Sequence, residues 1–379
     1  MPIEQGSLTL ALITAGAAFL VAIMAVPLLT RFAPSLGLLD RPGGHKLHEG
    51  EVPVVGGVAI FIAAAFGALY LGPPMPPTHW AFVAACLMLL GVGVIDDVKH
   101  VSPRSRLALQ AVVVTLCYLG LGFKVDSLGN LFGTGMIDLG AFALPFAILA
   151  TVALINAFNM LDGLDGLAGG VALVALLALC AWSLHDQRPL LAAVSAASIG
   201  GVLGFLMFNL PLPMRGDRLV FMGDGGSTLL GFVIAALCIG LQVEQSPQLS
   251  FYDIRGTVHP AELLWLVAIP VFEIVTTTLR RMMARMSPMQ PDNGHYHHRL
   301  RQAGWSVRAI FLLYLLFSVA SMLVGLSLHR LGMQDPVAFW GFLGLYALWH
   351  AGMVAAERRG LSRLAAASAA GAHAEVSSG

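Results

Sequence analysis

Long apolar stretches, separated by short polar segments, follow one another along almost the whole chain. There are eleven such runs, and each has close to the ~20 apolar residues that an α-helix needs to cross a bilayer. The runs are Leu8–Leu29, Val54–Leu71, Trp80–Ile95, Leu107–Gly122, Ala141–Met160, Leu167–Leu184, Pro189–Leu210, Ser227–Val243, Ala261–Leu279, Ala309–Leu328 and Val337–Ala356. We therefore expect an all-α polytopic membrane protein with about eleven transmembrane helices.

Basic residues are distributed unevenly between these runs. The segments after odd-numbered runs, together with the C-terminal stretch, hold all 21 Lys and Arg residues except Lys124, Arg188, Arg255 and Arg330. Cytoplasmic loops carry such an excess of basic residues. The pattern predicts an N-terminus outside the cell and a cytoplasmic C-terminus.

No segment between the runs is long enough to form a soluble domain. The sequence predicts a single integral-membrane domain over residues 1–360. Residues 361–379 are rich in Ala and Ser, and a disordered tail is expected there.

Composition agrees with a membrane protein and excludes other classes. The chain is 57% hydrophobic and 11% charged, with a mean hydropathy of +0.80. A soluble domain is only about half apolar and about a quarter charged, and a disordered chain has the opposite balance. The formal net charge is zero, so no nucleic-acid partner is expected.

Polar residues collect in the segments that the charge pattern places in the cytoplasm. The first cluster is the pair Asp96-Asp97, at the end of the third run. Adjacent carboxylates repel each other unless a cation lies nearby. An ordinary polar helix end is the alternative, although two acids at a helix C-terminus oppose the helix dipole.

The second cluster follows the fifth run, where Asn156, Asn159, Asp162 and Asp165 recur every three residues. On a helix the first three share one face. Such a stripe emerging from an apolar span is costly unless it lines a cavity. Hydrogen bonds between helices are the alternative, and they account more easily for one Asn than for all four residues.

The third cluster is Met222-Gly-Asp-Gly-Gly-Ser227, just before the eighth run. Its glycines would let backbone N–H groups approach an anion at a helix N-terminus, and Asp224 between them suits a cation. The alternative is a plain turn, with Ser227 as the helix cap.

The fourth cluster, after the ninth run, contains His295, His297, His298 and Arg299. A cationic, hydrogen-bonding patch of this kind suits phosphate recognition. A transition-metal site is the alternative, since imidazole also binds such metals. A fifth, weaker cluster contains Lys46 and His48, for which the alternative is a basic loop that only fixes topology.

Together these clusters indicate one kind of chemistry. Carboxylates without soft ligands favour Mg²⁺ or Mn²⁺, and the glycine turn and the histidine patch favour bound phosphates. A soluble phosphorylated donor and a membrane-held acceptor would meet at the cytoplasmic surface. This predicts phosphoryl transfer, which needs charge neutralisation and alignment more than covalent catalysis.

The same residues carry a resemblance to a known family. The segments GLLDRP…KLHEGEVPVVGG, GVIDDV…SPRSRL…Q, NAFNMLDGLDGLAGG, MGDGGSTLLGF and SPMQPDNGHYHHRL occur in this order. They resemble the polyprenyl-phosphate N-acetylhexosamine-1-phosphate transferases, and most closely the bacterial members that use UDP-N-acetylglucosamine and undecaprenyl phosphate. The motifs extend from about Gly37 to Gly304.

The resemblance implies a Mg²⁺-dependent transfer of N-acetylglucosamine 1-phosphate to undecaprenyl phosphate, with release of UMP, that starts synthesis of a cell-surface polysaccharide such as O-antigen. It implies a multi-pass protein of the bacterial cytoplasmic (inner) membrane, with a cytoplasmic active site and, as often in the family, a homodimer. Residue by residue, it implies catalytic roles for Asp96, Asp97 and Asp162, metal binding by Asp224, Asp162 and Asp97, and substrate binding by Asn156, Asn159, Asp165, His295, His297, His298, Arg299, Lys46 and His48.

The sequence departs from the family pattern at a few positions. Asn293 follows Asp292 where the family often has Arg, His45 stands where Arg is common, and Glu273 replaces a commoner Asp. The HHHxE-like ending of the translocases that use UDP-MurNAc-pentapeptide is absent, which argues against that substrate. Another UDP-N-acetylamino sugar stays open as an alternative donor. A secondary transporter is the distant alternative, and it would place polar residues near the middle of the membrane.

Overall fold

The computed structural model describes residues 5–40, 50–210, 220–242, 258–287 and 294–377, with side chains as far as Ala366. Almost all of these residues are helical. The helices are α1 Gln5–Leu36, α2 Gly56–Phe66, α3 Trp80–Lys99, α4 Pro103–Leu121, α5 Ala143–Leu161, α6 Leu167–His185, α7 Pro189–Asn209, α8 Gly223–Gln242, α9 Pro260–Leu266, α10 Ala268–Met283, α11 Tyr296–Gln302, α12 Val307–Arg330 and α13 Asp335–Ser377. The short elements are η1 Gly67–Leu71, η2 Pro77–His79, η3 Gly140–Phe142, β1 Leu39–Asp40 and β2 Val52–Pro53.

Each predicted apolar run coincides with a helix or with a consecutive helix pair. Within the described residues, 9 helices are long and apolar enough to cross a membrane. The run over residues 54–71 forms α2 and η1, which together make a shorter apolar helix. The predicted all-α polytopic membrane fold is therefore confirmed.

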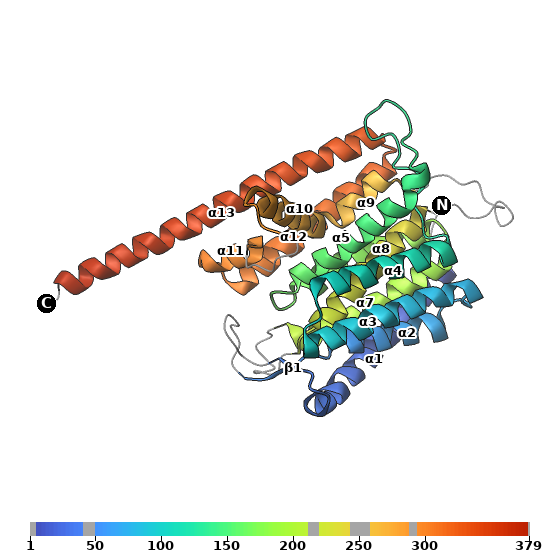
Figure 1. The fold of residues 1–379 in the computed structure, drawn as a ribbon, viewed down its shortest axis with the longest axis horizontal. Coiled ribbons are helices and arrows are strands. Elements are labelled where there is room, and N and C mark those ends of the chain that lie inside the picture. Colours follow the sequence, from blue (N-terminus) through green and yellow to red (C-terminus); the bar gives the residue numbers. More distant parts are fainter. Residues whose placement is uncertain (1–4, 41–49, 211–219, 243–257, 288–293, 378–379) are drawn as a thin grey trace.

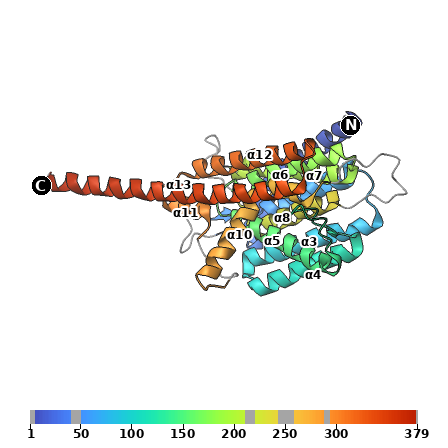
Figure 2. The same cartoon turned by 90° about the horizontal axis from the view of Figure 1, so that it is seen from above.

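The ninth run, Ala261–Leu279, is the exception, because it does not form the single straight helix expected of a membrane span. The structure divides it into α9 and α10, which meet at an angle of 90°. Pro270 explains why one straight helix cannot form, since in a continuous helix its ring would clash with the carbonyl of Leu266. Figure 2 shows α10 leaving the bundle to one side.

Helix α8 is the centre of the bundle. Every residue from Gly225 to Ile239 is buried, and α8 packs against α2, α3, α5 and α6. Glycine allows the closest of these contacts, since a Cβ on Gly231 would lie 2.6 Å from Ile155 Cα in α5. Helices α1, α4, α12 and α13 lie farther out and expose large apolar side chains, as expected of surfaces that face lipid.

A short antiparallel pair of strands, β1 and β2, leads the chain toward the beginning of α8. Val54 forms a parallel bridge with Phe221. The amide nitrogens of Gly56 and Gly57 then donate to the carbonyls of Phe221 and Met222, at 3.0 and 2.9 Å. These bonds fix the segment before α8 against the beginning of α2, at one end of the bundle.

Helix α13 is much longer than a membrane crossing requires. It has 43 residues, which corresponds to about 64 Å at the usual rise, and Figure 1 shows it projecting beyond the bundle. The sequence predicted a disordered tail over residues 361–379, whereas the structure continues α13 as a helix through Ser377. Helix α1 begins at the opposite end of the bundle.

Candidate active site

The acid pair lies where three helix backbones touch. A Cβ on Gly93 of α3 would lie 2.2 Å from Gly225 Cα of α8, and one on Gly57 of α2 would lie 2.3 Å from the amide nitrogen of Gly226. Only glycine permits such an approach. The last turn of α3, which carries Asp96 and Asp97, is thereby pressed against the first turn of α8, which carries Asp224.

Asp97 caps the N-terminus of α8. Its Oδ1 accepts a hydrogen bond from the amide of Asp224 at 2.9 Å, and its Oδ2 a longer one from the amide of Gly225 at 3.5 Å. A carboxylate in this position complements the helix dipole. Gly223, at the beginning of α8, has a φ of +77°, and a Cβ there would lie 2.6 Å from Asp97 Oδ2. Asp97 therefore fixes α8 relative to α3.

Arg106, from the first turn of α4, joins the other two carboxylates. Its Nη1 donates to Asp96 Oδ2 at 2.5 Å and to Asp224 Oδ2 at 3.0 Å. The other oxygen of Asp96 accepts from the amide of Val101 at 2.6 Å. Asp96 is buried, and a buried charge is tolerated when it is paired and hydrogen-bonded.

Sequence reasoning missed Arg106 as a site residue, because it was counted only among the basic residues that set topology. A signal was present in the same segment. Ser102 accepts from the amide of Ser105 as an N-cap, and Pro103 opens the helix, so α4 begins there. That start places Arg106 in the first turn, a few residues after the acid pair.

Two asparagines of the α5 stripe have different partners. Asn159 Nδ2 donates to Asp224 Oδ1 at 2.7 Å and to the Ser227 hydroxyl at 3.1 Å. Asn156 Nδ2 donates to Gln110 Oε1 of α4 at 2.8 Å and to the carbonyl of Val152 at 2.7 Å. Asn159 thus belongs to the carboxylate cluster, whereas Asn156 ties α5 to α4, the interhelical alternative left open by the sequence.

Asp162 ends α5 beside the same cluster. Burial raises the pKa of this carboxyl well above its usual range, and the negative charges of Asp224, Asp97 and Asp165 raise it further. Asp165 lies in the following turn, where Gly166 has a φ of +77°. A bound cation would relieve the repulsion among these carboxylates.

The histidine patch lies against the turn that follows Asp162. A Cβ on Gly163 would lie 2.7 Å from His297 Nε2 and 3.1 Å from His298 Nε2. His297 is fully buried, and neither of its ring nitrogens has a hydrogen-bond partner among the described residues. His295 instead shares a hydrogen bond of 3.1 Å with the Thr277 hydroxyl of α10.

The other predicted binding residues lie apart from this turn or cannot be placed. Arg299 Nε donates to Glu357 Oε1 at 3.0 Å, so its guanidinium faces α13. Glu273, one of the departures from the family pattern, is buried and accepts from the hydroxyl of Tyr314 at 2.5 Å. Lys46 and His48 lie outside the described residues.

The carboxylates of the cluster are oxygen donors of the kind that Mg²⁺ binds. Among the described residues, no three His, Cys, Asp or Glu side chains form a ready-made metal cage. Mg²⁺ usually takes only one or two protein carboxylates, together with phosphate oxygens and water. The crowded carboxylates, whose repulsion helps to raise the pKa of Asp162, fit such an ion with substrate completing its coordination.

Residues 79–242 match the model of Glycosyl transferase family 4. Proteins named undecaprenyl-phosphate alpha-N-acetylglucosaminyl 1-phosphate transferase from Yersinia pestis and Haemophilus influenzae are both 33% identical to this chain. The first alignment covers 84% of this chain and 83% of the relative, and the second covers 87% and 90%. The chain belongs to glycosyl transferase family 4.

Most residues of the carboxylate cluster lie in the segment that matches the family model. It extends from the 3₁₀ turn before α3 to the end of α8, and so contains the acid pair, Arg106, Asn159 and Asp224. The histidine patch lies beyond it. A protein of the same name from Escherichia coli K12 is 32% identical over 78% of this chain and 77% of its own length. The similarity to individual family members therefore extends well beyond the matched segment.

Acidification is expected to destabilise the protein through His297. Burial lowers the pKa of His297 well below its usual value, and the neighbouring His298 and His295 lower it further. The unfolded histidine binds a proton near pH ~6.5 and the folded one does not. The free energy of unfolding should therefore fall by about 1 kcal/mol per pH unit below that value.

Thermal unfolding of the purified protein in detergent, followed between neutral pH and about one unit below the histidine pKa, measures this effect. His297→Gln should flatten the pH dependence. His79 lies at the end of α3 that is far from Asp96 and Asp97. His79→Gln should therefore leave the pH dependence as in the wild type. Equal slopes for all three proteins would contradict the assignment to His297.

Proposed function

We propose that this protein transfers N-acetylglucosamine 1-phosphate from UDP-N-acetylglucosamine to undecaprenyl phosphate and releases UMP. The observation that carries the proposal is the convergence of Asp96, Asp97, Asp162 and Asp224 at one end of a membrane bundle. It occurs in a chain whose relatives are named for that reaction. A water-soluble donor and a lipid acceptor can meet at such a position.

The reaction exchanges one phosphorus–oxygen bond for another. An oxygen of the lipid phosphate attacks the phosphorus that carries the sugar, and the bond between that phosphorus and UMP breaks with its electrons on UMP. A phosphate monoester has a second pKa of about 6, so the attacking group is mostly ionised at neutral pH. A strong general base is therefore unnecessary.

The carboxylates would have different roles, according to the groups that surround each of them. Asp96 and Asp97 are held by Arg106 and by the α8 amides, and they would keep the reacting groups in line. Asp162, whose pKa is raised, is the carboxyl best suited to accept a residual proton. Asn159 and Asp165 would contact the nucleotide.

Asp224 and Asp162, with Asp97 behind them, would hold Mg²⁺, for which Mn²⁺ could substitute. Such an ion would supply charge neutralisation for the donor diphosphate. His297 and His298 face the same turn, and the ring nitrogens of His297 have no hydrogen-bond partner among the described residues. The two ring nitrogens of His297 would therefore be available for the diphosphate oxygens.

We further propose that the site faces the cytoplasm and that the membrane is the bacterial inner membrane. The segments at the site end of the bundle carry most of the Lys and Arg residues, which is typical of cytoplasmic loops. UDP-sugars are made in the cytoplasm, so the donor would reach the site directly. The lipid-linked product would feed a cell-surface polysaccharide.

The deciding experiment measures UMP release by the purified protein given UDP-N-acetylglucosamine, undecaprenyl phosphate and Mg²⁺. Release should require the lipid phosphate, stop with EDTA and return when Mg²⁺ is restored in excess. Parallel reactions with other UDP-N-acetylamino sugars and with UDP-MurNAc-pentapeptide test donor choice. No release with any donor, or uptake into proteoliposomes without UMP release, would contradict the proposal.

A further inference from the structure

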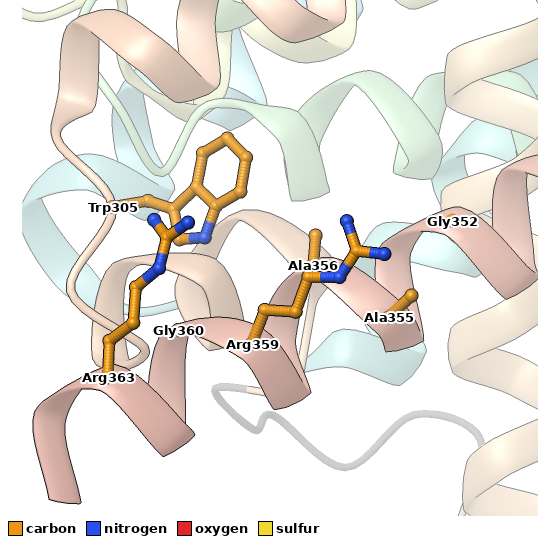
Figure 3. A pocket seen from close by; sticks show the side chains of 7 residues that line it. All are labelled: Trp305, Gly352, Ala355, Ala356, Arg359, Gly360 and Arg363. Atoms are coloured by element: carbon orange, nitrogen blue, oxygen red, sulfur yellow. The ribbon is translucent and has the colours of Figure 1, made fainter. Parts of the chain in front are cut away.

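A pocket lies away from the carboxylate cluster, between α13 and the turn that joins α11 to α12. It has a volume of about 450 Å³, within the range of ligand sites in proteins. Trp305 forms one wall, and Arg359 and Arg363 form the other. Figure 3 shows the Arg363 guanidinium pointing from α13 toward Trp305, and the Arg359 guanidinium pointing toward the side of Ala355.

The pocket carries positive charge without a matching acid. Its lining contains two arginines and no carboxylate. Glu357 is the nearest acid along α13, and it is engaged by Arg299 of α11. Among the described residues, neither Arg359 nor Arg363 forms an ion pair. The pocket therefore suits an anion.

Backbone contacts hold the two walls at a fixed separation. A Cβ on Gly360 would lie 2.3 Å from the carbonyl oxygen of Ala303, so α13 touches the turn directly. A Cβ on Gly304 would lie 3.4 Å from the Leu364 side chain. Because Gly360 lies between Arg359 and Arg363, these contacts fix the part of α13 that carries both arginines against the turn that carries Trp305.

The composition along α13 places the pocket at the membrane–water boundary. The apolar run of α13 ends at Ala356, and the charged residues begin at Glu357. Tryptophan is enriched at this boundary, and arginine reaches from it toward lipid headgroups. Gly352, Ala355 and Ala356 form a small-residue floor on the apolar side of the arginines, where an acyl chain can lie.

We propose that this pocket binds an anionic phospholipid, with its phosphodiester between Arg359 and Arg363 and its glycerol and acyl chains along the floor beside Trp305. A soluble anion would gain nothing from the apolar floor, whereas a lipid uses both parts. The bound lipid joins α13 to the α11–α12 turn. It thereby steadies α11, which carries His297 and His298.

The test uses the full-length protein reconstituted in phosphatidylcholine vesicles that contain a brominated lipid, either phosphatidylglycerol or phosphatidylcholine. Bromine quenches tryptophan fluorescence at contact distance. We expect brominated phosphatidylglycerol to quench more than brominated phosphatidylcholine. This excess should be lost in the double variant Arg359→Ala/Arg363→Ala and in Trp305→Phe.

Arg358→Ala is the matched control, because it removes an exposed arginine of the same turn that does not line the pocket. It should keep the excess quenching. Equal quenching of the wild type by the two lipids, or an excess that survives in the double variant, would overturn the proposal. Inorganic phosphate and glycerol phosphate are added separately. If they remove the excess, the ligand is a free phosphate and the lipid assignment is wrong. Because quenching needs no turnover, the result is independent of the proposed transfer reaction.

Discussion

Replacing Asp224 by Asn is expected to reduce sugar-phosphate transfer by about 10³-fold or more, the scale seen when a central charge-stabilising group is removed. Asp224 receives hydrogen bonds from Arg106 and Asn159, and its amide donates to Asp97. Asp224 thus connects α3, α4 and α5 to α8. An amide fills the same space but carries no negative charge, so it cannot balance Arg106 and is a weaker ligand for Mg²⁺.

The measurement is UMP release at saturating Mg²⁺ and saturating substrates. Asp126→Asn is the matched control, since this exposed carboxylate pairs with Lys124 between α4 and α5, away from the site. It should keep wild-type turnover. Near-normal activity of the Asp224 variant under the same conditions would refute the proposed role of Asp224.

The second large effect is expected from one methyl group at the helix contact. In Gly93→Ala the new Cβ would meet the backbone of Gly225 at 2.2 and 2.4 Å. Because backbone cannot move aside as a side chain can, α3 and α8 must separate, which lengthens the 2.9 Å bond between Asp97 and the Asp224 amide. Activity should fall about 10²-fold, since displacements near 1 Å have such effects. Overpacking should lower the free energy of unfolding by about 1–3 kcal/mol.

Gly91→Ala provides the comparison within the same helix. A Cβ at Gly91 meets nothing within 4 Å, so activity and the thermal midpoint should match those of the wild type. Turnover and the midpoint are measured together for both variants. If Gly93→Ala keeps full activity, the acid pair does not depend on the close approach of α3 to α8.

The helices could be predicted from sequence because most of them face lipid or a packed apolar core. Apolar run length alone then marks each crossing, and every predicted run is helical in the structure. The length of an apolar run indicates that the segment is shielded from water, but it does not show where the helix axis bends. The right angle between α9 and α10 therefore could not be predicted from run length. Pro270 carries that information, because proline prevents a helix from continuing straight through it.

The site was predicted in part, for a comparable reason. Asp96, Asp97, Asp162 and Asp224 are conspicuous because acids are costly at the end of an apolar span. Arg106 is not conspicuous in the same way, because basic residues are expected in any cytoplasmic loop. Contacts such as Asn156 with Gln110 depend on how α4 and α5 lie together, which the pattern along one chain does not contain.

The close contact of α3 with α8 has a consequence for synthesis of the protein. Asp97 and the Asp224 amide that it binds are separated by 127 positions in the chain, which takes roughly 6 to 25 s to translate at 5–20 residues per second. Arg106 follows Asp96 by only 10 positions, so one carboxylate gains its counter-charge almost at once. Asp97 stays exposed to water at the membrane surface until α8 has been inserted. The reaction centre is completed only then.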